Sequence, residues 1–375
     1  MPLFSRRPAL RWFVPLVLAL LLAGGGTAFG VLTAAAGGGL PTRSAAQLLV
    51  DVQNARVAGL SGTVVQTADL GVPSIPGAGG GTSLASLVSG SHTMRVWYAG
   101  PNQVRVALQD SLAESDVVRN GKDLWIWSSK DKTASHHALP LSQPDAPDPS
   151  AGAQQLTPQQ VADQALKAIS PTTKVSTQGT AEVAGRSAYE LVLSPRDRST
   201  LVDSVHIAID GETHVPLRVQ VFARSMTDPA FSVGFTSFDP STPDASVFAF
   251  NPPPGTKVTE SKVTEARAPE SGGAAQSSSG QAEPGHQAGA APAGGTKPTV
   301  VGSGWTSVAI AKLPGGVLDA QGTLGQFLGK LPKVNGSWGA GRLLRGTLFS
   351  AVLTDDGRLV IGAVPPDTLY QALGR

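Results

Sequence analysis

The sequence predicts an α+β protein in which antiparallel strands outnumber helices and follow one N-terminal apolar segment. Short stretches of alternating apolar and polar residues recur along the chain, and two stretches with helical periodicity interrupt them. Glycine (44) and proline (29) are frequent among the 375 residues, and only 15% of the residues are charged. This composition is typical of short strands joined by many turns.

The N-terminal segment from Trp12 to Thr42 is uncharged and follows Arg6, Arg7 and Arg11. Basic residues stay in the cytoplasm, and an apolar run of this length enters the membrane. We therefore expect residues 1–43 to be a signal or transmembrane segment, retained as a single anchor on the extracytoplasmic face of the membrane. The alternative is a signal peptide cleaved near the small residues 27–30, which would release a secreted protein.

Composition excludes several classes of function. The chain has no cysteine, which excludes disulfides, thiol catalysis and cysteine-ligated metals. The net charge is only +2, and no basic run is mixed with aromatic residues, so we expect no nucleic-acid partner. The length is enough for two domains in addition to the anchor and a linker.

The first folded segment begins with a predicted helix over residues 44–57. Ser44 and Gln47 have the spacing of a capping box, and Leu48, Leu49 and Val52 fall on one helical face. The dipeptide Asn120-Gly121 then predicts a tight hairpin. Alternation predicts strands at residues 61–68, 93–98, 104–108, 116–119 and 124–127.

A second helix is predicted to begin at Thr157 and to end before Pro171, since Thr157, Pro158 and Gln160 form an N-terminal capping pattern. Its apolar face contains Val161, Leu166 and Ile169. Further strands are predicted at residues 180–183, 188–193, 205–209, 217–222 and 231–235. We assign residues 44–256 to one domain that ends after the proline run.

Residues 257–298 are predicted to be a disordered linker, because they are rich in Gly, Ala, Ser, Gln, Pro and Glu and have no sustained apolar periodicity. A separate small module is expected over residues 299–375. Its predicted elements are a strand at 305–311, a short helix at 322–331, a hairpin at 345–364 around Asp355-Asp356-Gly357, and a helical turn after Pro366.

Four segments resemble the LolA/LolB superfamily, and more closely its sigma-factor regulatory branch, the RseB/MucB-type proteins of actinobacterial type. They are the first helix with the strand that follows it (46–65), residues 116–127, residues 183–191 and residues 209–218. The last two segments contain a Gly-Arg-x-Ala-Tyr hairpin and an Asp-x-x-Thr-x-x-Pro-Leu turn, which are common in this group. The resemblance covers residues 44–258.

The resemblance implies a curved antiparallel half-barrel sheet wrapped around helices, with an apolar cavity, no catalysis and no cofactor. The implied ligand is the acyl chain of a lipid or a lipoprotein. The small C-terminal module is implied to contact a membrane partner such as an anti-sigma factor. A retained anchor favours a sensor or regulator over a LolA-type lipoprotein carrier, which must diffuse. A membrane-anchored scaffold for protein interactions is the alternative.

Apolar side chains on the concave side of such a sheet are expected to form the ligand cavity. An acyl chain suits an apolar cavity because each buried methylene contributes about 0.8 kcal/mol. The expected cavity residues are Leu48, Leu49, Val52, Met94, Val96, Tyr98, Val104, Val106, Leu108, Trp125, Trp127, Val161, Leu166 and Ile169.

Two interpretations of Trp125 and Trp127 remain open. Both residues share one face of a strand, opposite Leu124 and Ile126, so that both faces of this strand are apolar. The two tryptophans are either ordinary core aromatics or part of the cavity wall.

No familiar catalytic or metal-binding motif occurs in the chain. His136 and His137 are adjacent on a strand and point to opposite faces, and no carboxylate lies at ligand spacing, so we expect no metal site. A third hypothesis is a hydrolase that uses Asp203, Ser204 and His206. Strand alternation separates Asp203 from the other two, which argues against it.

Overall fold

The computed structural model describes residues 39–72, 89–109, 113–139, 170–262, 298–313 and 328–374. The expected anchor, the second predicted helix and most of the predicted linker lie outside these ranges. Within the ranges, no helix is both long and apolar enough to cross a membrane.

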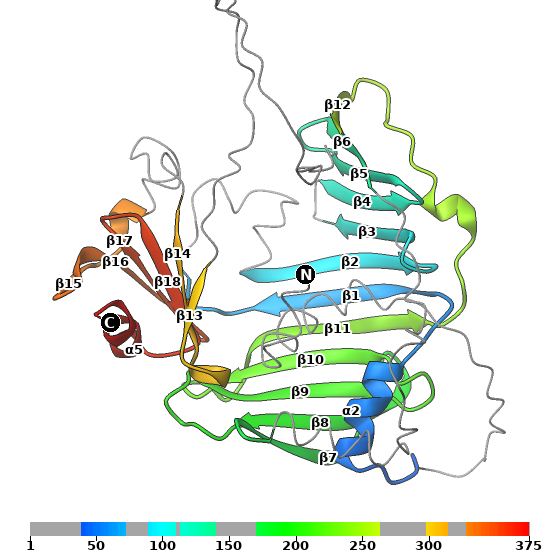
Figure 1. The fold of residues 1–375 in the computed structure, drawn as a ribbon. Helices are drawn as coiled ribbons and strands as arrows, with labels where there is room; N and C mark the ends of the chain where they lie inside the picture. Colours follow the sequence, from blue (N-terminus) through cyan, green and yellow to red (C-terminus); the bar gives the residue numbers. More distant parts are fainter. Residues whose placement is uncertain are drawn as a thin grey trace, which may run out of the picture.

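Twelve of the described strands form one open, curved sheet (Figure 1). They are β1 (Leu60–Ala68), β2 (Gly90–Tyr98), β3 (Gln103–Gln109), β4 (Glu114–Asn120), β5 (Asp123–Ser128), β6 (Thr133–Ala138), β7 (Thr173–Val183), β8 (Arg186–Pro195), β9 (Val202–Asp210), β10 (Pro216–Ala223), β11 (Pro229–Asp239) and β12 (Lys257–Lys262). Their order is β12-β6-β5-β4-β3-β2-β1-β11-β10-β9-β8-β7, and only the β12–β6 pair is parallel. The curved antiparallel sheet that the resemblance implies is confirmed, with one parallel pair at its edge.

Helix α2 (Ala45–Asn54) packs on one face of this sheet, which we call the inner face. The Ser44 amide donates to Gln47 Oε1 (2.9 Å) and the Gln47 amide donates to Ser44 Oγ (3.2 Å), so the predicted capping box is confirmed. Leu48 and Leu49 are buried in a core shared with the strands, where full burial of one leucine stabilises the fold by about 1.5–3 kcal/mol. The largest sheet residues in this core are Leu60, Tyr98, Tyr189, Leu191, Ile207, Ile209, Leu217 and Phe235.

The buried face of the sheet changes between β1 and β4. Val64 of β1 is buried on the inner face, whereas the buried residues of β4, Asp116 and Val118, point to the opposite, outer face. The connection from β11 to β12 covers this outer face and places the 3-10 helix η2 (Ala245–Phe248) against β3 and β4. Phe248 is completely buried there. This connection therefore supplies a second core on the outer face.

Strand β12 corrects the predicted linker, because Lys257–Lys262 pair in register with Thr133–Ala138 of β6. The pairing begins where the Lys257 amide donates to the Lys132 carbonyl (2.8 Å). β12 is an edge strand whose residues are polar or charged apart from Val258, which is 46% exposed, so its pairing with β6 buries no apolar face. A strand of this kind leaves no hydrophobic period in the sequence.

A second sheet contains the six described strands β13 (Thr299–Val301), β14 (Val308–Lys312), β15 (Lys333–Gly336), β16 (Gly339–Arg345), β17 (Ser350–Thr354) and β18 (Arg358–Gly362), in the order β13-β14-β18-β17-β16-β15. Helix α5 (Pro366–Leu373) packs on it, and Val352, Val360 and Leu369 are fully buried. The predicted hairpin is confirmed as β17 and β18. The predicted strand at 305–311 begins later, at Val308, because the 3-10 helix η3 (Gly304–Thr306) precedes it.

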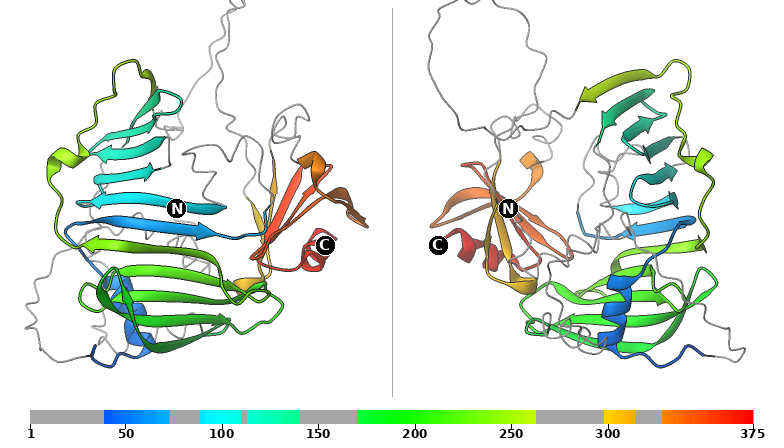
Figure 2. Two further views of the ribbon diagram at one scale, coloured as in Figure 1. Left: turned by 180° about the vertical axis from the view of Figure 1, so that it is seen from behind. Right: turned by 45° about the vertical axis from the view of Figure 1, so that its right-hand side comes forward.

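The second sheet and α5, which we call the C-terminal unit, dock on one end of the large sheet (Figure 2). Trp305 donates from Nε1 to Thr173 Oγ1 (2.8 Å), and the Leu201 amide donates to the Ala363 carbonyl (2.9 Å). A third contact joins the Thr347 amide to the Leu70 carbonyl (2.7 Å). Side chains packed against the large core from this unit are Trp305, Leu348 and Ala363.

Candidate functional site

A row of apolar side chains crosses the inner face from β2 to β5. The strand register pairs Val96 with Val106, Val106 with Val117, and Val117 with Ile126. Exposure rises along this row, since Val96 is 8% exposed, the next two are half-buried and Ile126 is 41% exposed. α2 lies over the other half of the sheet (Figure 1). We call the row and its neighbours the inner apolar surface, which consists of Met94, Val96, Val104, Val106, Val117, Leu124 and Ile126.

The remaining predicted cavity residues have other positions. Leu48 and Leu49 of α2 are buried, and Val52 packs against the core of the large sheet. Tyr98 and Leu108 lie on the same inner face, paired with Val104 and Met94, and both are buried. The last three predicted residues lie outside the described part of the chain: Val161, Leu166 and Ile169.

Trp125 and Trp127 lie on the outer face, where the register places them beside Val118 and Asp116. Their ring centroids are 5.5 and 6.2 Å from that of Phe250 in the covering connection. These tryptophans therefore do not share a cavity with the inner valines, because strand alternation turns them to the opposite face. The contact with Phe250 favours the interpretation of both rings as core aromatics.

Sequence reasoning missed Val117, Leu124 and Ile126 as members of the inner apolar surface. A usable signal was present, because Leu124 and Ile126 alternate with the two tryptophans. The sequence pattern does not indicate which of the two apolar faces of β5 is covered. Phe248 and Phe250, which cover the outer face, lie more than a hundred positions further along the chain.

An ionic cluster on the outer face lies beside the second core. Arg105 Nη2 donates to Asp116 Oδ2 at 2.5 Å, and its guanidinium lies 5.5 Å from the Trp97 ring centroid. Burial and the neighbouring Asp116 carboxylate raise the pKa of Glu114. Arg105 thus balances the buried charge of Asp116. Its Nη1 also donates to the Val247 carbonyl (3.1 Å), which holds the connection from β11 to β12 against the outer face.

His136 joins the edge strands β6 and β12. Its Nδ1 lies 2.8 Å from Glu260 Oε2, its Nε2 lies 2.8 Å from Asp123 Oδ1, and its ring stacks on Trp125 at 4.3 Å. The fold thus brings two carboxylates to this histidine that the sequence did not place near it. The described residues contain no group of three or more side chains able to hold a metal. Hydrogen bonding to Asp123 raises the pKa of His136, and Glu260 adds to this effect.

We predict that the attachment of β12 weakens as the pH rises. A protonated His136 donates to both carboxylates, so its contribution is complete below its ordinary pKa of about 6.5 and is lost through the raised pKa of the folded state. Hydrogen-exchange protection factors of the β12 amides should therefore fall above neutral pH. In His136→Gln they should be low throughout and independent of pH, whereas His137→Gln should behave as the wild type.

Two of the four segments that resemble the LolA/LolB superfamily, residues 183–191 and 209–218, meet in one ion pair with a buried carboxylate. Arg186 Nε and Nη2 donate to the two carboxylate oxygens of Asp210 at 2.6 and 2.9 Å. Asp210 Oδ2 also accepts from the Thr213 amide (2.8 Å) and hydroxyl (2.7 Å). Burial alone would raise the pKa of Asp210, but these hydrogen bonds outweigh it and hold the pKa below its ordinary value. The motif residues are therefore structural, and they fix the turn between β9 and β10.

The residues of the hydrolase hypothesis, Asp203, Ser204 and His206, are not all in contact with one another. His206 Nδ1 lies 2.9 Å from Glu190 Oε1 and its Nε2 lies 3.3 Å from Ser204 Oγ, whereas Asp203 pairs with Arg224 at 3.2 Å. The order Ser–His–Glu matches a nucleophile, a base and an orienting acid. However, Ser204 is buried near the start of β9, where it pairs with Phe222 of β10, so a substrate has little access to its hydroxyl. The geometry thus favours a hydrogen-bonded structural cluster.

No model of a known protein family matches the sequence, and no curated protein matches it. Solved structures do match. The MucA/MucB complex of Pseudomonas aeruginosa contains a chain that is 18% identical, with a TM-score of 0.42, covering 88% of this chain and 96% of that one.

Two smaller structures are also similar. A LolA-superfamily protein of Nitrosomonas europaea is 12% identical, with a TM-score of 0.20, and covers 56% of this chain and 99% of its own. Lipoprotein LppX of Mycobacterium tuberculosis is 12% identical, with a TM-score of 0.26, and covers 50% of this chain and 90% of its own. The chain is thus similar to solved structures of the group that the sequence resembles, and at these identities and TM-scores the similarity carries no conclusion about its family or its function.

Proposed function

We propose that this protein is an extracytoplasmic, non-catalytic regulatory protein that binds the acyl chain of a lipid or lipoprotein on the inner apolar surface. The observation that carries the proposal is the row from Val96 to Ile126, which becomes more exposed with distance from α2. The four residues of this row are apolar and offer continuous contact across four strands, and Arg119 lies in the adjoining row, between Val104 and Leu124. An acyl chain gains about 0.8 kcal/mol for each methylene that it buries there.

The N-terminal apolar segment supports a retained membrane anchor and therefore a sensor rather than a diffusing carrier. The proposed partner is a membrane protein such as an anti-sigma factor, bound through the C-terminal unit, in line with the resemblance to RseB/MucB proteins. A scaffold that binds only proteins is the competing proposal, and it needs no ligand on the inner face.

Native mass spectrometry with lipid extraction, on the full-length protein from its host, tests the proposal. A bound acyl species of defined mass is the expected result. A clean unliganded mass that persists after challenge with added lipids would contradict acyl binding and leave the scaffold.

We predict that Ile126→Glu lowers the affinity for palmitic acid by about tenfold or more, since a carboxylate would have to be desolvated beside the acyl chain. Ile361→Glu is a matched control, because Ile361 is a strand isoleucine of similar exposure (37% against 41%) that lies in the C-terminal unit. Titration with fluorescence or calorimetric detection measures both variants. Equal affinities of the two variants would exclude the inner apolar surface as the site.

A further inference from the structure

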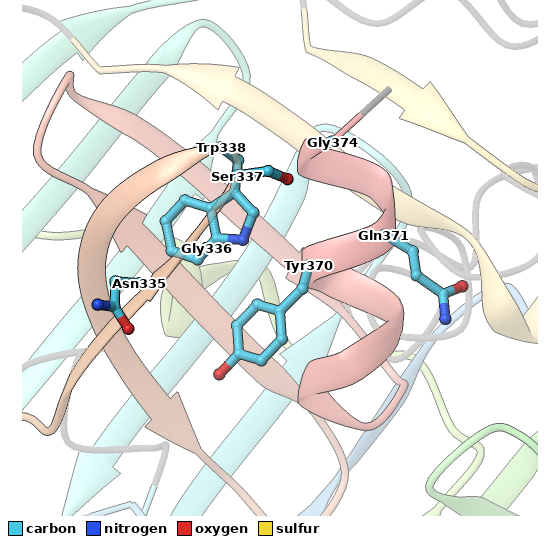
Figure 3. A pocket seen from close by; sticks show the side chains of 7 residues that line it. All are labelled: Asn335, Gly336, Ser337, Trp338, Tyr370, Gln371 and Gly374. Atoms are coloured by element: carbon cyan, nitrogen blue, oxygen red, sulfur yellow. The ribbon is translucent and has the colours of Figure 1, made fainter.

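The C-terminal unit contains a hollow of about 530 Å³ between the β15–β16 turn and α5 (Figure 3). The hollow is separate from the inner apolar surface, which belongs to the large sheet. No charged residue lines it, since the lining consists of Asn335, Gly336, Ser337, Trp338, Tyr370, Gln371 and Gly374. The chemistry of this site is therefore aromatic and neutral.

Two rings form the floor of the hollow. Trp338 and Tyr370 have ring centroids 5.7 Å apart and planes only 19° from parallel. Figure 3 shows both rings side by side, each turning a face in the same direction. Both are half-buried and pack against the core of the C-terminal unit, so their orientation is fixed before any ligand arrives.

Gly336 is what allows the indole to lie flat. A Cβ at this position would come within 2.6 Å of Trp338 Nε1 and 3.0 Å of its Cδ1, so any side chain would push the ring away. The turn thus combines a glycine with a tryptophan two residues later in a way that holds the ring parallel to Tyr370.

The rim of the hollow is polar. Asn335 and Ser337 are exposed and offer an amide and a hydroxyl, which both donate and accept hydrogen bonds, whereas the Gln371 side chain extends from the side of α5 that faces away from the two rings (Figure 3). A flat apolar floor with neutral hydrogen-bonding groups at its edge matches a pyranose ring, which has an apolar C–H face and a rim of hydroxyl groups. Ligand pockets commonly combine aromatic walls with a few such polar groups.

From this geometry we propose that the hollow is a binding site for a neutral saccharide, with the sugar ring stacked on Trp338 and Tyr370. A proline-rich peptide is the competing ligand, because it also docks on aromatic residues. Peptides of this kind occupy successive grooves along an extended surface, whereas the two rings here form one compact platform. The absence of charge from the lining favours a neutral ligand over an acidic one.

Calorimetric titration of the full-length protein with two neutral oligosaccharides, chitotetraose and maltotetraose, tests the proposal. We expect saturable binding of at least one of them. Trp338→Ala should weaken it by about tenfold or more, since it removes most of the apolar contact. Trp97→Ala is the control, because Trp97 is also half-buried but lies on the large sheet between Arg95 and Arg105, and its loss should leave the affinity unchanged.

Trp338 contributes to the core of the C-terminal unit, so a second pair of variants keeps the test decisive. Asn335→Ala removes only an exposed side chain beside the rings and should lower the affinity severalfold without changing thermal unfolding, whereas Gln371→Ala removes an exposed side chain that faces away from the rings and should leave the affinity unchanged. Absence of saturable binding at millimolar saccharide would overturn the proposal. So would binding that is insensitive to both Trp338→Ala and Asn335→Ala, or a proline-rich peptide that saturates the hollow while the saccharides do not.

Discussion

Replacing Arg186 by alanine should destabilise the protein by about 3–5 kcal/mol, the cost of leaving a buried carboxylate without its partner. The Asp210 side chain is 1% exposed and receives two hydrogen bonds from Arg186. Without the guanidinium, only Thr213 remains to satisfy it. Urea unfolding followed by circular dichroism measures the loss.

Glu212→Ala is the matched control, because Glu212 contacts the same guanidinium at 2.7 Å but is 81% exposed. Exposed ion pairs contribute little, so this variant should unfold near the wild-type midpoint. The lowered pKa of Asp210 also predicts how the stability of the fold changes with pH. The pair stabilises the fold above the ordinary carboxyl pKa, and this stabilisation is lost as the pH falls through the lowered value. Equal midpoints for Arg186→Ala and Glu212→Ala would contradict the structural role.

The second large effect is expected from Phe248→Ala, which should cost about 3–5 kcal/mol by leaving a cavity in the second core. Phe248 is completely buried, and it holds the β11–β12 connection against β3 and β4. Loosening this connection should also expose Trp125 and Trp127, which contact Phe250 two residues later. We therefore expect a red-shifted tryptophan emission together with the lower unfolding midpoint.

Val247→Ala serves as the comparison for that experiment. Val247 is only half-buried, and the bond from Arg105 goes to its backbone carbonyl, which the substitution keeps. The variant should lose much less stability and keep the wild-type emission maximum. An unchanged emission maximum in Phe248→Ala would mean that the connection does not cover the outer face in solution.

Local signals in the sequence predicted local structure well. The capping box at Ser44 and Gln47 and the hairpin at Asn120-Gly121 depend on residues within a few positions, and both are present, with Gly121 at φ +64°. The alternation in β2 and β3 likewise placed Met94, Val96, Val104 and Val106 on one face. These features need no knowledge of distant parts of the chain.

Features that depend on residues far apart in the chain could not be predicted from the sequence. Both faces of β5 are apolar, so only the position of Phe248 and Phe250 decides that Trp125 and Trp127 belong to the outer core. β12 is held by backbone pairing with β6 and by the contact of Glu260 with His136. Neither interaction produces an alternation of apolar residues in the sequence. The pairing of His206 with Glu190 likewise depends on how β8 and β9 align.

The docking of the C-terminal unit has a consequence for the shape of the large sheet. Its contacts reach Leu70, just after β1, and Leu201, just before β9, and these two strands are separated by β11 and β10 in the sheet order. The unit therefore links β1 to β9 and restricts changes in the curvature of the sheet between them. A ligand that binds better to one curvature of the sheet must change the free energy with which the C-terminal unit docks. By thermodynamic reciprocity, a partner that pulls the C-terminal unit away must change the affinity for that ligand by the same factor.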